Sequence, residues 1–244
     1  MRTLLSLVIS ASSIALSGAD SVATLLLVAV LLRNNMPQQE ILIGDLISRY
    51  AAGERNFSEV IIETPFPQTS SWELGHFRGL DLSGIILRNS SIRWIAIYMD
   101  GVILRGADLT DVDLGESNFE GADLSNAILR ETKYFQSAFN GANLSGADLT
   151  GAELVDSGFI GVNLCGANFT NARIDDITFA CNNLNKAIFN GARLKNVLFD
   201  EAKLVRTDFR GADFGKDKRG ASGVRFRDCC FGKTLMPDGS VRGS

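Results

Sequence analysis

Residues 101–150 read GVILR GADLT DVDLG ESNFE GADLS NAILR ETKYF QSAFN GANLS GADLT. The same five-residue period continues without a slip to Gly215 and makes 23 blocks. Of the 23 central residues, 12 are Leu and 9 are Phe, and the residue two before the centre is Ala in 12 blocks. A period of five fits neither an α-helix nor a simple strand, so it predicts a tertiary repeat.

A second period of 20 residues is superimposed on the first. Because twenty residues make four blocks, every fourth block occupies an equivalent place. This predicts a coil with four sides that stacks at the strand spacing of about 4.8 Å. Large central residues point inward, and small residues fill the corners. Three sides are named by their centres: the Phe wall (Phe119, Phe139, Phe159, Phe179, Phe199), the Leu wall (Leu104, Leu124, Leu144, Leu164, Leu184, Leu204) and the charged wall (Leu114, Tyr134, Leu154, Ile174, Leu194, Phe214).

The blocks resemble the consensus A-(D/N)-L-X-X of the pentapeptide-repeat family. The resemblance implies an all-β solenoid, a right-handed quadrilateral β-helix, with regular coils over 101–215. Upstream, irregular early coils are expected over 57–100, and the segment 50–58 resembles the lead-in of cyanobacterial members. A seven-residue spacing before Leu104 predicts a two-residue bulge near Tyr98–Asp100. The early positions in register are Phe57, Ile62, Phe77, Leu82, Leu87, Ile92 and Ile97, with Pro67 and Trp72 in two further slots.

The N-terminal segment 1–34 is strongly hydrophobic. Residues 3–32 contain no Lys or Arg and only one acid, Asp20, and about 20 apolar residues suffice to span a bilayer. The sequence favours a hydrophobic membrane helix, with most of the chain on the cytoplasmic side because positive charge follows the segment. One alternative is a secretory signal cleaved after Ala19, which places the mature chain outside the cell or in a thylakoid lumen. Another is an interfacial or hairpin insertion.

Both ends of the repeat are expected to be covered. Residues 35–56 carry apolar positions at helical spacing, including Ile41, Leu42 and Leu46, and predict a short amphipathic capping helix. Residues 216–244 lose the repeat and are expected to form a C-terminal cap, with Phe226 and Phe231 covering the last open strand edge.

Enzymatic chemistry is not expected. The only histidine is His76, and the four cysteines lack the paired spacing of a zinc site. Carboxylates recur before the block centres, but on the outer wall of a convex rod they have no cleft in which to act as acid and base. We therefore expect no catalytic residue, cofactor or metal. These carboxylates are Asp108, Asp113, Asp123, Asp148, Glu153, Asp208 and Asp213.

The charge distribution separates two interaction hypotheses. The best-known family activity implied by the resemblance is mimicry of duplex DNA by dimeric rods that bind bacterial gyrase. Such mimicry needs a long negative surface, whereas residues 101–160 carry 10 acids and 3 bases and residues 161–244 carry 9 acids and 14 bases. We therefore favour a membrane-tethered protein-interaction scaffold, with modulation of a gyrase-type topoisomerase as the alternative, and expect no direct nucleic-acid binding.

The sequence also indicates where a protein partner would bind. The Phe wall has small or uncharged residues beside its centres, with Glu120 and Asp200 only towards its ends. Interface cores are depleted in charge, so this strip is the candidate surface for a protein partner or for a second copy in a homodimer. Its alternatives are an ordinary bland wall or a strip covered by the tail. The candidate residues are Ala138, Gly158, Ile160, Thr178, Ala180 and Leu198.

Overall fold

The computed structural model describes residues 38–63, 77–92, 97–216 and 223–243. The chain divides into two units, Met1–Gln38 and Gln39–Ser244. The second unit is built around its own hydrophobic core, so we expect it to fold without the first. The predicted membrane segment and His76 lie outside the described residues. Within the described ranges, no helix has both the length and the apolar character needed to span a bilayer.

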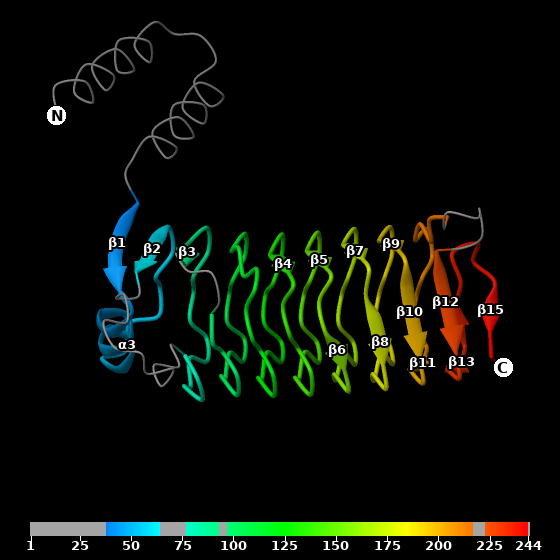
Figure 1. Cartoon of the computed structure of the whole chain (residues 1–244), viewed down its shortest axis with the longest axis horizontal. Helices are drawn as coiled ribbons and strands as arrows, with labels where there is room; N and C mark the ends of the chain where they lie inside the picture. Colours follow the sequence, from blue (N-terminus) through cyan, green and yellow to red (C-terminus); the bar gives the residue numbers. More distant parts are fainter. Residues whose placement is uncertain (1–37, 64–76, 93–96, 217–222, 244) are drawn as a thin grey trace, which may run out of the picture. The chain divides into compact units, whose positions relative to one another are not determined.

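The second unit is a solenoid of parallel β-structure whose coils follow one another in chain order (Figure 1). Successive coils pair at an offset of 20 residues, as at Asp123 and Asn143. The predicted four-sided β-solenoid is therefore confirmed. Strands on the charged wall are β4 (Lys133–Phe135), β5 (Glu153–Val155), β7 (Arg173–Asp175) and β9 (Arg193–Lys195); those on the Phe wall are β6 (Phe159–Ile160), β8 (Thr178–Ala180), β10 (Val197–Asp200) and β12 (Val224–Arg227); those on the Leu wall are β11 (Lys203–Val205) and β13 (Cys230–Gly232).

The core is a column of side chains inside the tube. Every block centre from Leu104 to Phe209 is at most 2% exposed. On the Phe wall the rings of Phe119 and Phe139 stack with centroids 4.9 Å apart, one ring per coil. A second ladder lies on the opposite side, which we name the fourth wall, where Phe169 and Phe189 stack at 4.7 Å. Burying each such ring contributes roughly 1.5–3 kcal/mol. The centres of the fourth wall are Leu109, Leu129, Leu149, Phe169, Phe189 and Phe209.

The corners use two different hydrogen-bonding schemes. At most corners a tight turn closes on itself, as where the Ala122 N–H donates to the Phe119 carbonyl at 3.0 Å. Gly121 takes φ +66° there, the left-handed conformation that glycine adopts without a Cβ penalty. At other corners this N–H has a side-chain partner on the next coil: Ser137 N–H donates to Ser157 Oγ at 3.1 Å. A buried polar residue at a position normally filled by Ala therefore replaces the turn bond.

The early coils differ in register from the sequence expectation. Tyr98 pairs with Asn118, so Met99, and not Ile97, is the centre that precedes Leu104. The extra residues lie between Ile92 and Met99 instead of at Tyr98–Asp100, because Met99 is the residue buried opposite Phe119, at 4% exposure. The five-residue spacing of Met99 and Leu104 was hidden by a second buried residue, Ile97, two positions before Met99.

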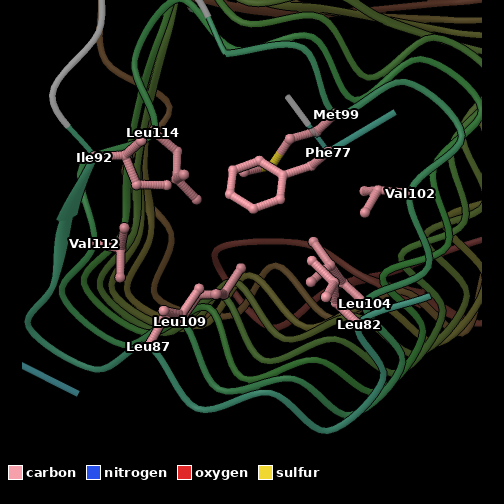
Figure 2. Close-up of a pocket in the computed structure, with 10 residues that line it drawn as sticks. All are labelled: Phe77, Leu82, Leu87, Ile92, Met99, Val102, Leu104, Leu109, Val112 and Leu114. Atoms are coloured by element: carbon pink, nitrogen blue, oxygen red, sulfur yellow. The ribbon is translucent and has the colours of Figure 1, made fainter. Parts of the chain in front are cut away.

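An apolar cavity of about 10 Å³ lies in these early coils. Figure 2 shows its lining, which comes from all four sides of the tube and contains only one ring, that of Phe77. Here Met99 interrupts the Phe ladder, and the fourth wall offers Leu87 and Leu109 instead of phenylalanines. The remaining gap has about the volume that one water needs, but no polar group lines it to hold one.

The N-terminal cap begins with a strand, which differs from the helix predicted over 35–56. β1 (Gln39–Leu42) pairs in parallel with β2 (Val60–Glu63), which pairs in turn with β3 (Ser91–Ile92). Of the described residues 38–56, only Ile43–Ala51 is helical, as α3. The open edge of β2 explains the difference, because a strand satisfies its backbone groups and a helix does not. Ile41 still points inward, at 5% exposure, and α3 buries Leu46 completely.

The tail continues the solenoid for a further coil where loss of the repeat was expected. β12 pairs with β10 and β13 with β11, at an offset of 27 residues. Phe226 stacks on Phe199 with centroids 5.1 Å apart, and Phe231 lies opposite Leu204. The coil ends in an antiparallel pair, β14 (Thr234–Leu235) and β15 (Val241–Arg242). Arg242 lies over the Phe231 ring, 3.8 Å from its centroid, and helps to cover the end.

All three long connections of the solenoid occur at one corner. They join centres of the charged wall to centres of the Phe wall: Ile62 to Phe77, Ile92 to Met99, and Phe214 to Phe226. Between the second and the third, five coils pass the same corner with the regular spacing of five residues.

Candidate functional site

The fold brings the six candidate residues together on the outer face of the Phe wall. Four of them form a column in which Ala138 pairs with Gly158, and Thr178 with Leu198. The other two, Ile160 and Ala180, pair with each other in the column on the far side of the Phe centres. The inward-facing phenylalanines hold this surface flat because they stack directly behind it.

Ile160 is an exposed apolar member of the strip. Its side chain is 57% exposed, while Leu198 is half-buried. The Ile160 backbone N–H donates to Asn140 Oδ1 at 3.1 Å, which fixes the strand edge beneath the side chain. A fixed backbone with an exposed branched apolar side chain is suited to contact with another surface.

The tail does not cover the strip within the described ranges. β12 lies alongside β10 as the next strand of the same sheet, and so lengthens the wall. It also brings charge: Arg225 pairs with Leu198, and Arg227 forms an ion pair with Asp200. The apolar strip therefore ends at β10.

The Leu wall and the fourth wall differ in chemistry from the strip. On the Leu wall, Asn143, Asn163 and Asn183 form a ladder in which each amide donates to the oxygen one coil earlier, with distances of 3.0–3.2 Å. Arginines also join neighbouring coils, as where Arg130 contacts Asp148 at 2.6 Å. These groups already satisfy one another, so they offer a partner less than the strip does.

The hydrogen bonds between side chains of the fourth wall lower the pKa values of two carboxyls. Burial raises the pKa of Asp108, but hydrogen bonds from Arg88 and Thr110 outweigh it and hold that pKa below its usual range. The same balance, with Thr150 and Arg130, lowers the pKa of Asp148. Both carboxyls are therefore ionised structural links at neutral pH.

The sequence did not reveal two exposed aromatic residues, Tyr98 and Phe135. Phe135 follows the Tyr134 centre on the charged wall and is 49% exposed. The position after a centre points outward, so the block pattern contained the signal, but the surrounding charges concealed it. Tyr134 itself is buried, its hydroxyl has no hydrogen-bond partner among the described residues, and burial raises its pKa.

The described residues contain no cluster of three or more His, Cys, Asp or Glu side chains arranged to hold a metal ion. The four cysteines are free thiols. The non-enzymatic role and the DNA-mimic alternative both stay predictions.

Two models of known protein families match the repeat region of the chain. A model of the pentapeptide repeat region matches residues 132–209, and a model of pentapeptide repeats in eight copies matches residues 99–133. The chain belongs to the pentapeptide-repeat family. Membership implies a right-handed β-helix, in agreement with the parallel solenoid. No curated protein matches this pentapeptide-repeat chain.

Several solved pentapeptide-repeat structures are similar to the chain. HetL from the cyanobacterium Nostoc sp. strain PCC 7120, involved in heterocyst differentiation regulation, is 24% identical over 83% of this chain and 100% of HetL, with a TM-score of 0.43. Trypsin-treated QnrB1, a plasmid-mediated fluoroquinolone resistance protein, is 18% identical over 80% of this chain and 85% of its own, with a TM-score of 0.42. A protein from the Arabidopsis thaliana thylakoid lumen is 30% identical over 52% of this chain and 76% of its own, with a TM-score of 0.24.

Proposed function

We propose that this pentapeptide-repeat chain is a non-enzymatic scaffold that binds a protein partner through the Phe wall. The observation that carries the proposal is the uncharged strip over β6, β8 and β10, with Ile160 exposed at its centre. A rigid core stands behind the strip, so little ordering free energy is lost on binding.

We further propose that residues 3–32 tether the scaffold to a membrane, with the solenoid on the cytoplasmic side. The support is the sequence alone, a run of 30 residues without Lys or Arg. Export, with cleavage after Ala19, is the competing arrangement.

A double substitution tests the strip. Ile160→Asp with Leu198→Asp places two charges where an interface core would exclude water, so we expect loss of partner capture from crosslinked native membranes. Residue 160 is exposed and residue 198 is half-buried, so the far-UV spectrum should not change.

The matched control lies on the charged wall. Val155→Asp with Lys195→Asp also changes one half-buried and one exposed residue, and it should retain the captured partner. Equal loss from both double variants, or loss from neither, would remove the Phe wall as the binding surface.

A further inference from the structure

Two corners of the solenoid carry columns of opposite charge. We name as the basic corner the column between the Leu wall and the fourth wall, formed by Lys186, Arg206 and Lys233. The acidic corner lies between the charged wall and the Phe wall. It consists of Glu116, Gln136, Asp156 and Asp176.

Among the described residues, no ion pair balances the charge of either column. Asp156 accepts a hydrogen bond from Gln136 and Asp176 one from Asn196, both from neutral amides. Elsewhere on the rod the usual arrangement is an arginine beside an acid, as in Arg105 with Asp123 at 2.6 Å.

Both columns also carry a local free-energy cost. Their members repeat once per coil, about 4.8 Å apart, so like charges face one another along each corner. They also hold the left-handed conformation, with φ of +59° at Arg206 and +51° at Asp156, but so do non-glycine residues at the other two corners, such as Asp111, so the charge and not the conformation distinguishes these columns. A stack of like charges without a balancing contact among the described residues of its own chain indicates a contact outside it.

Each corner has an apolar neighbour that could accompany its charges into an interface. At the basic corner Val205 is 38% exposed and Ile188 is 36% exposed. At the acidic corner it is Phe135, at 49%. A patch that combines charge with a few exposed apolar side chains is typical of weak protein–protein contacts.

We propose that copies of this chain associate side by side, with the basic corner of one copy against the acidic corner of the next. The two columns share the same coil rise, so their charges stay in register along the contact, which an unrelated acidic surface would match only by chance. This association goes beyond the proposed function, because it uses two corners and leaves the outer face of the Phe wall available.

The placement of the corners determines the form of the assembly. Figure 2 shows the four sides of the tube around the core, and the two corners are diagonally opposite on it. Each copy therefore offers one acidic and one basic surface, and such a heterologous contact builds open chains when no rotation closes it. Exposed ion pairs are weak and screened by salt, so the chains should form only at low ionic strength.

Zero-length coupling with a carbodiimide tests the contact on the full chain in a non-ionic detergent. An equal mixture of ¹⁴N- and ¹⁵N-labelled protein should give mixed-isotope links from Lys186 or Lys233 to Glu116, Asp156 or Asp176. Within one chain the core separates these groups, so such links can only join two copies. Their yield should fall about tenfold between about 20 mM and about 500 mM NaCl. Absence of these links at low salt would overturn the proposal.

Neutralised variants make the test independent of the coupling chemistry. Sedimentation should show monomers for Lys186→Gln/Arg206→Gln/Lys233→Gln and for Glu116→Gln/Asp156→Asn/Asp176→Asn. An equal mixture of the two should give dimers and nothing larger, because one working contact remains per pair. Both should fold, since Gln136 already occupies such a corner with φ +51°, and a far-UV spectrum checks this.

A control variant separates the contact from a general charge effect. Lys133→Gln/Arg193→Gln/Arg225→Gln removes three exposed positive charges from the charged wall and the Phe wall, and it should assemble like the parent. Loss of assembly in this control, or species larger than dimers in the mixture, would contradict the one-donor, one-acceptor contact.

Discussion

Asn182 shows how much a single residue contributes to this solenoid. It is fully buried at a position that is usually Ala; its Oδ1 accepts the Val162 N–H at 2.7 Å and its Nδ2 donates to the Phe159 carbonyl at 3.0 Å. Asn182→Ala removes both hydrogen bonds, and the Val162 N–H and the Phe159 carbonyl can then regain a partner only by closing on each other, as Ala122 and Phe119 do. We expect a loss of about 2 kcal/mol in urea unfolding. Ala192→Gly, at a buried position without such bonds, is a comparison that should cost about 1 kcal/mol; an equal loss in both would contradict this role for Asn182.

A substitution at Met99 is expected to stabilise the solenoid. Met99→Phe would extend the ladder from Phe77 to Phe119 and fill part of the apolar cavity. Ring stacking and cavity filling each stabilise by about 1 kcal/mol, so we expect a higher midpoint of thermal unfolding. A lower midpoint would show that the early coils are too narrow for a ring. Phe119→Met removes a ring from the filled part of the tube and should lower the midpoint.

At the scale of the strand and helix, the hydrogen bonds and ion pairs of aspartates on the outer walls should make the free energy of unfolding depend on pH. The pKa values of Asp108, Asp123 and Asp148 are lowered in the folded state because the hydrogen bonds they accept, including those from arginines, outweigh burial. A lowered folded pKa stabilises the fold above the unfolded value of about 3.9, and this contribution is lost as pH falls through the folded pKa.

We therefore expect the free energy of unfolding to fall as pH drops from about 5 towards 2. Asp148→Asn should flatten this dependence, because an amide cannot take up the proton. Denaturant unfolding at a series of pH values measures both, and an unchanged pH dependence in Asp148→Asn would contradict this role of the carboxyl.

The helix α3 and strand β1 form a separate element with its own prediction. Leu46 is fully buried under α3, so Leu46→Asp should detach the helix from the core, while Asp45→Leu on its exposed face should not. Detachment uncovers the first coil, and we expect faster aggregation, measured by light scattering. Unchanged aggregation would show that β1 alone protects the edge.

The repeat and its interruptions differ in how far they could be predicted. The blocks from Leu104 to Phe214 predicted the coil, the walls and the core, because the same pattern of a large apolar centre recurs every five residues. The strand at 39–42 could not be found this way, because its pairing with β2 depends on an edge that exists only after folding. The last coil was missed because its centres Phe226 and Phe231 keep the spacing of five only after seven inserted residues.

At the scale of the whole molecule, the six candidate residues lie together on one wall, but the charged strand that follows them was not predicted. The six residues came from the block register, whereas Arg225 and Arg227 on that strand came from a coil that the sequence pattern concealed. The tether can be tested at the same scale. We expect the full chain to resist carbonate extraction and residues 35–244 to remain soluble and β-rich. A mature protein that begins at Asp20 in the soluble fraction would contradict the tether.

The shared corner of the three long connections has a practical consequence. A solenoid that receives extra residues at Ile62–Phe77, Ile92–Met99 and Phe214–Phe226 without losing its wall register has one seam along which its backbone can be opened. A foreign peptide grafted beside Gln136 or Asn196, on the regular coils of that seam, should be displayed on the surface with the tube intact. The same graft beside Gly146, at the corner diagonally across the tube, should be tolerated less well. The fold thus provides a display scaffold whose insertion points lie in a line, about one coil rise apart.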